Sequence, residues 1–554
     1  MRRPRWLAAG AIPIAVALII SGCGSGGDEG SEDPGAGTGG DPAKNESVEV
    51  TVFGTEPERP LVPMDTSETG GGKIVDALFT GLMDYDPVSG QPREANAESF
   101  ELTAPDEYTV KLKKDWTFHD GTPVTSDSYI DAWNYAAYGP NAQQHASFFA
   151  QIQGFDDVFT PDPDGVEGPQ LPATPKTDKL SGLTKVSDTE FKIKFTEPHA
   201  IFKDKTGYSA YMPMPKSFFA DPEAWKKNPV GNGGWKYVAR VPDQELQVER
   251  YDDYKGEDKP KVKKVKFVFT DSDAAYADVK GNQLDFLDTV PPQAIAGNVW
   301  ETDLPGRAKA YPVMAIQAIA FPLYDPKYSS ADFRHAVSMA INREQITKTI
   351  YEGNRQPIKG YAMDKVPGYE DGACGDFCEY NPEKAKELFD KSGWTGPIQL
   401  TSNADGGHKE WIEAACGNIQ EALGVECTFE PVQAFGQIRD AINARQMTQI
   451  YRSGWLADYP SVENFLNPIY RTGGSSNDND YSNPEVDAKL AAADAAETTD
   501  EAYKLYHEAE ELIAKDMPAI PLWNTPSISA WSERLTNVRL TPKRELDLSY
   551  VEVK

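Results

Sequence analysis

A short apolar segment near the amino terminus, closed by a cysteine, determines which part of this chain can fold. Three arginines precede the apolar run 7–20, and the segment ends in Ile20-Ser21-Gly22-Cys23. A basic start, an apolar centre and small residues before the cleavage point make up an export signal, and the run is too short to span a bilayer comfortably. We therefore expect residues 1–22 to be a signal peptide of the lipoprotein type, with Cys23 carrying a lipid on its thiol.

Two alternatives concern this leader. An ordinary secretory signal with a chance cysteine is the first, but small residues directly before Cys23 and the absence of other cysteines nearby favour lipidation. Arg2 and Arg3 form a pair that also occurs in twin-arginine export signals, although the surrounding residues match poorly. The choice between the general and the twin-arginine export route stays open.

Residues 23–47 follow the leader and are rich in Gly, Ser, Asp, Glu and Pro. Almost nothing in them is apolar, so folding could not offset the entropy lost by ordering them. We expect a disordered tether, which as a flexible coil spans about 25–30 Å. It would hold a soluble body at the outer face of the cytoplasmic membrane.

The body is large and acidic. The chain has 554 residues and a formal net charge of −31, and loss of a leader with three arginines and no acids makes it −34. Such a charge disfavours nucleic acid and anionic membrane surfaces as partners. The length predicts more than one lobe, and we interpret the acidity as a source of solubility rather than as evidence for a cationic ligand.

Four cysteines remain in the body, an even number in an exported chain, which favours disulfides over free thiols. The simplest pairing joins neighbours, Cys374 with Cys378 and Cys416 with Cys427. A tetrathiolate zinc site is the alternative. It is disfavoured because Cys416 and Cys427 are too far apart for a zinc knuckle and the compartment is oxidising.

Hydrophobic periodicity predicts a mixed α/β body. Alternation favours strands at 48–54, 108–112, 245–250 and 262–269, and helical spacing favours the helices in the list that ends this paragraph. Ser126 or Asp127 would cap the second of these helices. The predicted helices are 72–82, one from Tyr129, one around 333–341, 343–353, 411–423 and 500–515.

Four segments resemble the peptide-binding proteins of ATP-binding-cassette importers, and they occur in that family's order. They are Lys113-Lys-Asp-Trp-Thr-Phe-His-Asp-Gly-Thr-Pro-Val-Thr125, Phe333-Arg-His-Ala-Val-Ser-Met-Ala-Ile-Asn-Arg343, Ser453-Gly-Trp-Leu-Ala-Asp-Tyr-Pro460 and Tyr481-Ser-Asn-Pro-Glu-Val-Asp487. Each alone has an ordinary structural explanation, but four in order are specific. One departure is Gly231-Asn-Gly-Gly-Trp235, where the family commonly has a Gly-Thr-Gly-Pro-Tyr type of turn.

The resemblance implies an α/β fold of the two-lobed periplasmic-binding-protein type (type II), with an extra subdomain in the first lobe. Lobe one would comprise 48–312 and 519–554, and lobe two 313–518. It implies a monomeric, lipid-anchored receptor that binds oligopeptides between the lobes and delivers them to the membrane permease subunits of an importer. It implies neither catalysis nor a cofactor.

The resemblance also implies ligand residues in the segment around Trp455. Asp458 matches the aspartate that pairs with the α-ammonium group of a peptide, and a carboxylate in a closed cleft suits that role. The alternative for Asp458 is a loop aspartate that caps a turn. Trp455 would form an apolar wall. The backbone of Gly454, Leu456 and Ala457 would pair with an extended peptide, or the segment is simply a buried strand.

Further candidates rest on position. Arg452, and Arg445 at a shorter spacing than in the family, match cations that meet the peptide carboxylate or backbone; the alternative for each is a surface ion pair. In lobe one, Glu56, His145 and Phe148 are positional candidates, with ordinary aromatic packing as the alternative for Phe148.

Enzymatic motifs are missing from the sequence. It contains no Gly-x-Ser-x-Gly, no His-Glu-x-x-His and no phosphate loop, and its six histidines are scattered. We predict neither catalytic residues nor a metal site. The main rival within the fold is another solute, such as a sugar oligomer, a nickel chelate or an antibiotic precursor, because site residues and not folds determine function. An exported hydrolase is the rival from another class.

Overall fold

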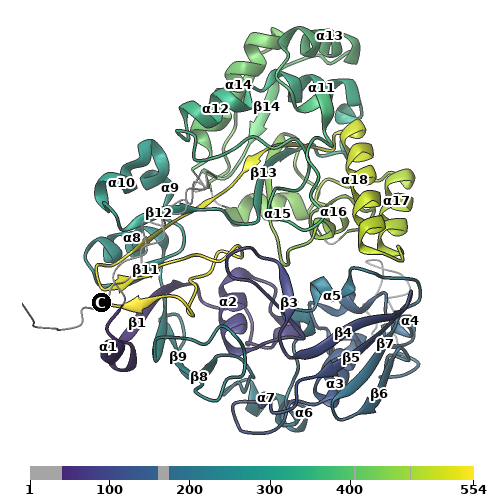
Figure 1. Ribbon diagram of the computed structural model, residues 1–554. Coiled ribbons are helices and arrows are strands. Elements are labelled where there is room, and N and C mark those ends of the chain that lie inside the picture. The colour runs from purple at the N-terminus through teal and green to yellow at the C-terminus, as the bar shows by residue number, and fades with distance from the viewer. Residues whose placement is uncertain (1–39, 160–173, 405–406, 434, 475) are drawn as a thin grey trace, which may run out of the picture. The chain divides into compact units, whose positions relative to one another are not determined.

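The computed structural model describes residues 40–159, 174–404, 407–433, 435–474 and 476–554 (Figure 1). The predicted signal peptide 1–22 and the lipid-bearing Cys23 lie outside the described residues, as does the tether up to residue 39. In the described part of the chain no helix is both long and apolar enough to cross a bilayer.

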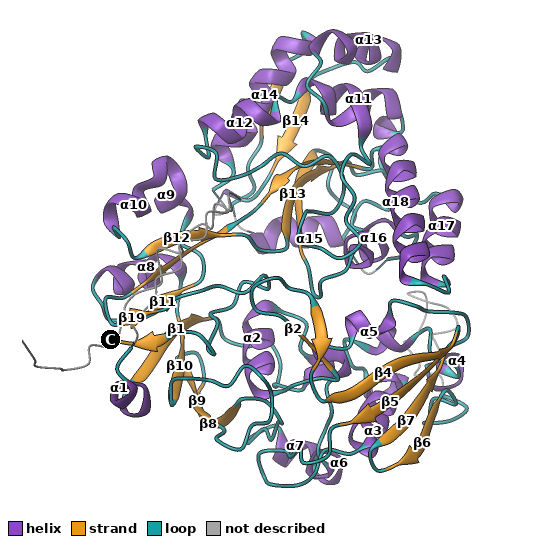
Figure 2. Cartoon of the chain, viewed as in Figure 1, coloured by secondary structure: helices purple, strands orange, loops and turns teal. Residues whose placement is uncertain are grey.

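Three sheets organise the described residues, as the strands in Figure 2 show. A seven-stranded sheet has the order β12 (Ala308–Tyr311), β18 (Ser527–Trp531), β11 (Phe286–Leu287), β1 (Glu49–Gly54), β10 (Lys264–Phe269), β9 (Glu245–Arg250) and β8 (Trp235–Val241). A five-stranded sheet has the order β15 (Cys427–Phe429), β14 (Ile398–Thr401), β16 (Ile450–Leu456), β13 (Ala315–Ala320) and β17 (Ala519–Asn524). A four-stranded antiparallel sheet has the order β4 (Ala97–Ala104), β5 (Glu107–Leu112), β7 (Glu190–Lys194) and β6 (Leu183–Ser187).

Two short hairpin-like pairs complete the strands. β2 (Met83–Tyr85) pairs with β3 (Pro92–Glu94), and β19 (Leu535–Thr536) pairs with β20 (Glu552–Val553). The seven-stranded sheet is mixed, because β1 runs parallel to β10 and β11 while the remaining neighbours are antiparallel. Along β1 every second residue is buried, which is the alternation that predicts this strand from the sequence.

The helices cover these sheets. On the side of the seven- and four-stranded sheets they are α1 (Pro42–Ser47), α2 (Thr69–Leu78), α3 (Ser126–Ala137), α4 (Phe155–Val158), α5 (Phe202–Lys205), α6 (Lys216–Ala220), α7 (Pro222–Trp225), α8 (Ser272–Lys280), α9 (Pro292–Ile295) and α10 (Val299–Asp303). Between β13 and β17 in sequence lie α11 (Ala331–Ala340), α12 (Arg343–Thr349), α13 (Pro382–Ser392), α14 (Lys409–Leu423), α15 (Phe435–Asn443), α16 (Val462–Tyr470), α17 (Pro484–Asp494) and α18 (Thr499–Asp516). One buried cluster of apolar side chains fills the five-stranded sheet and its helices, and a second fills most of the remainder.

The chain passes between the two larger sheets twice. Pro312–Met314 joins β12 to β13, and residues 525–526 join β17 to β18. The first passage lies where the sequence places the limit of lobe one. For the second, β17 pairs with β13 in the five-stranded sheet, so sheet membership places the passage at 525–526 rather than at 518–519.

The prediction of a disordered tether up to residue 47 is wrong for its last residues, which form α1. Asp41 caps this helix by accepting a hydrogen bond from the backbone of Ala43. Asn45 is buried, and its side-chain oxygen accepts from the backbone of Val553 at 2.8 Å. A polar segment is therefore ordered by hydrogen bonds to the carboxyl-terminal strand, which composition does not reveal.

Two predicted helix starts are also corrected. α2 begins at Thr69, three residues before its predicted start, because the Glu68 carboxylate accepts from the backbone of Gly71 at 2.8 Å and caps the helix. The cap of α3 is Thr125, whose backbone N–H donates to the Ser128 hydroxyl in a capping box. Neither Ser126 nor Asp127 is the cap.

Both disulfides join neighbouring cysteines as predicted. Cys374 pairs with Cys378, and Cys416 on α14 pairs with Cys427 at the start of β15. The four thiols are thus used, which excludes the tetrathiolate zinc site.

Candidate ligand-binding site

One edge of β16 has no neighbouring strand over most of its length. On one side β16 pairs with β13 from Tyr451 to Leu456. On the other side β14 pairs with it only through Ile450 and Tyr451. Among the described residues, the edge from Arg452 to Leu456 is therefore open, and its backbone groups can pair with an extended chain.

A cavity of about 190 Å³ lies along this edge. Arg452, Gly454 and Trp455, three of the predicted ligand residues, are among those that line it. Gly454 has a steric reason to be glycine, since a Cβ there would lie 2.8 Å from the backbone oxygen of Ile316 on β13. The absent side chain keeps the two strands close and the open edge unobstructed.

Asn464, in the first turn of α16, holds two predicted ligand residues in place. Its side-chain oxygen accepts from the Trp455 indole N–H and from the Asp458 backbone N–H, each at 2.9 Å. Its amide nitrogen donates to Asp458 Oδ2 at 3.2 Å. Asn464 is only 1% exposed, so its orientation is fixed, and it fixes Trp455 and Asp458 in turn.

Asp458 is a half-buried carboxylate without a cationic partner within 4 Å among the described residues. Burial raises the pKa of this carboxyl above its usual range, and the Asn464 hydrogen bond and the charge of Lys543 oppose the shift without cancelling it. A carboxylate kept from water and left without a counter-ion gains from a ligand cation. This geometry suits the ammonium group of a peptide.

Aromatic side chains from distant segments of the chain pack on the residue after Asp458. Phe148 and Tyr208 lie 6.4 and 5.9 Å, ring centre to ring centre, from Tyr459, the residue after Asp458. His145 lies next to Tyr208, with its Nε2 3.3 Å from the Tyr208 hydroxyl. Burial lowers the pKa of His145 to about 4, so the ring is neutral and acts as part of an aromatic wall.

The opposite end of the open edge carries unpaired positive charge. Arg452 has no carboxylate within 4 Å among the described residues, its Nε is buried without a partner, and one long hydrogen bond of 3.4 Å reaches Gln317. The guanidinium carbon of Arg355 lies 3.9 Å from the centre of the Tyr351 ring. Arg355 likewise has no carboxylate partner among the described residues. Burial, together with the charge of Arg355, lowers the pKa of Arg452 to about 10.

His408 lies near both guanidinium groups. Burial, and then the charges of Arg452 and Arg355, lower its pKa to about 3, so the imidazole is neutral. Its Nδ1 accepts from the Trp411 indole N–H at 3.2 Å. Two guanidinium groups beside a neutral imidazole form an environment that favours an anion, such as a carboxylate.

The other predicted residues take different positions. Arg445 pairs with Asp480 at 2.7 Å and is 40% exposed, which is the surface ion pair weighed as its alternative. Glu56 pairs with Arg240 on β8. Leu456 is half-buried against the core of the seven-stranded sheet, and the buried Ala457 donates its backbone N–H to Met314 at 2.9 Å.

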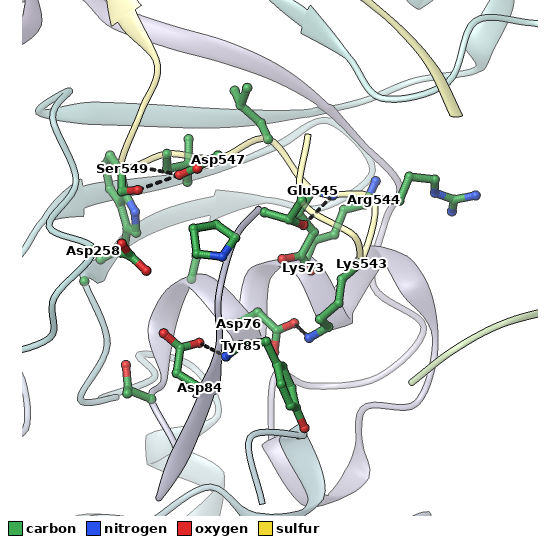
Figure 3. A pocket seen from close by; sticks show the side chains of 18 of the residues that line it. Lys73, Asp76, Asp84, Tyr85, Asp258, Lys543, Arg544, Glu545, Asp547 and Ser549 are labelled. Carbon is green, nitrogen blue, oxygen red and sulfur yellow. Dashed lines mark hydrogen bonds and ion pairs between the residues drawn. The ribbon is translucent and has the colours of Figure 1, made fainter. Parts of the chain in front are cut away.

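A second cavity, of about 210 Å³, is lined by none of the predicted ligand residues. It lies among α2, the β2–β3 pair and the carboxyl-terminal segment 541–549, and we call it the hairpin cavity. Figure 3 shows Lys543 beside Asp76, with Lys73, Arg544 and Glu545 nearby. Burial, and then the charge of Asp76, raise the pKa of Glu545 to about 8.

Most charges of the hairpin cavity already have partners inside the chain. Asp76 pairs with Lys543, Asp288 with Lys73 at 2.5 Å, and Asp547 with Arg539. The unpaired charges of the β16 edge thus make that edge, and not the slightly larger hairpin cavity, the candidate ligand site. No cluster of potential metal ligands occurs in the described ranges.

Comparison with known proteins identifies the family. The model of the bacterial extracellular solute-binding proteins, family 5 (middle), matches residues 91–477. The chain belongs to this family. Its members are binding proteins rather than enzymes, so the predictions of the family and of a non-enzymatic role are confirmed.

The relatives of this solute-binding protein match it over nearly its whole length. It is 23% identical to the oligopeptide-binding protein OppA of Bacillus subtilis, over 91% of this chain and 92% of that protein. It is 25% identical to the periplasmic oligopeptide-binding protein OppA of Escherichia coli, over 82% and 83%. The structure of Haemophilus influenzae OppA in complex with the peptide RPPGFSPFR matches with a TM-score of 0.72 at 20% identity, over 91% and 98%, which confirms the predicted binding-protein fold.

Three residues of the candidate site in this solute-binding protein escape the sequence analysis. Asn464, Arg355 and Tyr208 come from separate segments and carry no motif of their own. Arg355, in the loop after α12, and Tyr208, after α5, reach the site only through the fold. An asparagine in the first turn after the Trp-Leu-Ala-Asp-Tyr segment is a weak signal that could have pointed to Asn464.

Proposed function

We propose that this protein binds extended oligopeptides along the open edge of β16 and delivers them to the permease of an ATP-binding-cassette importer. The peptide would lie antiparallel to β16. Its ammonium group would meet Asp458, and its carboxylate would meet Arg452 and Arg355. Backbone pairing along the edge would bind chains of varied sequence, because it depends little on side chains.

One observation supports this proposal above the others: among the described residues, an unpaired strand edge has a carboxylate without a cationic partner at one end and guanidinium groups without a carboxylate partner at the other. A zwitterionic extended chain complements this arrangement. From Arg452 to Asp458 the backbone advances by about 20 Å. After allowance for the reach of the side chains, an extended peptide of about four or five residues fits between the two ends.

The names of two relatives support a peptide as ligand, since both are oligopeptide-binding proteins. The alternative is a non-peptide solute in the same fold, such as a sugar oligomer, a metal chelate or an antibiotic precursor. A neutral sugar would leave both Asp458 and Arg452 without counter-ions in a closed site, which is costly. The charged ends therefore favour a peptide.

The remaining parts of the proposal concern architecture and location. Lobe one would contain the seven- and four-stranded sheets, lobe two the five-stranded sheet, and the two short passages at 312–314 and 525–526 would form the hinge. The monomeric receptor would be anchored by lipid on Cys23 at the outer face of the cytoplasmic membrane, beside its transporter.

Mass spectrometry of the ligand released from denatured protein tests the ligand class. We expect peptides, followed in calorimetry by an affinity maximum at about four or five residues in a series of unblocked peptides. Release of a non-peptide solute, or an affinity that does not depend on length, would overturn the proposal.

The anchor is tested separately. Cys23→Ala should move the protein from the membrane fraction to the soluble fraction without a change in peptide affinity. Membrane attachment that persists in this variant would exclude the lipid anchor.

A further inference from the structure

A buried ion pair joins α5, next to the four-stranded sheet, to α16, next to the five-stranded sheet. Lys205 Nζ lies 3.0 Å from Glu463 Oε1, and the two side chains are 9% and 6% exposed. Glu463 directly precedes Asn464, the residue that holds Asp458.

Glu463 is fully bonded within its own side of the contact. The Tyr459 hydroxyl donates to Oε2 at 2.5 Å, and the Asn467 amide donates to Oε1 at 3.0 Å. Lys205 is its sole cationic partner among the described residues, and Glu463 is the one carboxylate paired with Lys205 there. Lys205 also lies 5.9 Å from the centre of the Tyr459 ring.

Three further hydrogen bonds link residues 151–204 to residues 494–503. Gln151 donates to Asp494 Oδ2 at 3.3 Å, His199 Nδ1 lies 3.0 Å from the backbone oxygen of Asp494, and Tyr503 donates to Asp204 at 3.4 Å. Burial lowers the pKa of His199 to about 4, so this ring is neutral and adds no charge. In the described part of the chain, Lys205 with Glu463 is the ion pair among these contacts.

A buried ion pair adds little to folding stability, because the cost of desolvating both groups offsets their attraction. Removal of one partner is nevertheless costly, because the other charge is then buried without a counter-ion. Burial of both groups is therefore favourable only in the arrangement in which they contact each other. When its two sides separate, water solvates both groups and the penalty disappears. It therefore sets the register of a closed state more than it adds to folding stability.

We propose that Lys205 and Glu463 form a latch that closes the two lobes in the one register that completes the Asp458 end of the ligand site. This inference rests on the proposed function. In it Lys205 is a positioning residue: it touches no ligand, and it acts through Glu463, Tyr459 and Asn464 on the carboxylate that receives the ammonium group.

The test is a double-mutant cycle measured by calorimetry with an unblocked pentapeptide. Lys205→Met and Glu463→Gln should each weaken binding at least about 50-fold, because each leaves one buried charge in the closed state. The double variant should recover to within about fivefold of the wild type, because it leaves none. Lys203 is a half-buried lysine on the same helix and has no ion pair with any described residue. Lys203→Met is therefore the matched control, and its affinity should stay within about twofold of the wild type.

A second readout separates a latch from a permanent structural bond. The unfolding midpoint of the ligand-free single variants should stay close to that of the wild type, because both groups are hydrated when the lobes are open. Single variants that lose stability without ligand, or a double variant that binds as weakly as the singles, would overturn the latch.

The latch can also be judged if the wild type binds no peptide, a result that would count against the proposed function alone. Hydrogen exchange of the backbone amides of α5 and α16 in the ligand-free wild type then tests whether the contact opens. Fast exchange at both segments supports a contact that opens, and full protection at both overturns it.

Discussion

The β16 edge and the hairpin cavity differ in how their charges are compensated. Both are recesses of about 200 Å³ lined by charged side chains. In the hairpin cavity, Asp547 accepts from Arg539, from the Ser549 backbone and from the Ser549 hydroxyl. At the β16 edge, Asp458 and Arg452 have no oppositely charged partner among the described residues.

The difference teaches that pairing, more than size, distinguishes a ligand site from a structural cluster. A charge compensated inside the chain stabilises the fold and has little left to offer a ligand. A half-buried charge without a counter-ion costs stability, and a ligand of opposite charge relieves that cost. Substitutions in the two regions should therefore separate into losses of affinity and losses of stability.

The largest expected effect is on affinity. Arg452→Gln should weaken binding of a peptide with a free carboxylate about 100-fold, because the carboxylate then loses one of the two guanidinium groups that would bind it. A carboxyl-amidated peptide should lose far less. Unfolding by denaturant should show unchanged or higher stability, because an uncompensated buried charge is removed. A clear loss of stability with affinity retained would reverse the assignment of Arg452.

Asp547→Asn is the matched change in the hairpin cavity. Asp547 is 4% exposed and fully bonded, so loss of its charge should lower the free energy of unfolding by about 2–4 kcal/mol. Peptide affinity at a temperature where the variant is folded should stay within about twofold. Denaturant titration and calorimetry on one preparation give both values, and a large loss of affinity would place this cavity in the ligand site.

A smaller effect is expected at Asn464. Asn464→Ala removes the group that orients Asp458 and Trp455, so it should weaken binding of unblocked peptides about tenfold through lost preorganisation. An N-acetylated peptide should be affected less, since it does not use the Asp458 charge. Equal losses for the two peptides would indicate general damage to the site.

The smallest expected effect is the pH dependence. Burial raises the pKa of Asp458, so on acidification this carboxyl takes up a proton at a pH above the usual range of aspartates. Since the ionised form binds the ammonium group, affinity for unblocked peptides should fall severalfold between about pH 7 and pH 4.5. Asp458→Asn should remove this dependence, and an unchanged slope in the variant would assign it to another group.

Sequence alone predicts the local elements well and the site only in part. Strands such as 245–250 and 262–269 carry their alternation in their own residues. Helix starts depend on single caps, and Thr125 and Glu68 take roles that their neighbours could equally have had. α1 is ordered by partners some five hundred residues away, as the Asn45 to Val553 hydrogen bond illustrates.

The same reasoning explains the site. Gly454, Trp455 and Asp458 lie in one motif, and Arg452 directly precedes it, so a resemblance brings them together. Arg355 and Tyr208 join them only through the packing of distant segments, which no local pattern encodes. Arg445 pairs with Asp480 at the surface, and its contact with the ligand stays a prediction.

The most direct test of the unpaired-charge account is a cycle between Asp458 and the amino group of the ligand. Calorimetry would compare the wild type and Asp458→Asn, each with an unblocked pentapeptide and its N-acetylated form. We predict that acetylation weakens binding to the wild type about 100-fold and binding to the variant less than about threefold, with both proteins equally stable. Equal affinity of the wild type for the two peptides would contradict the account.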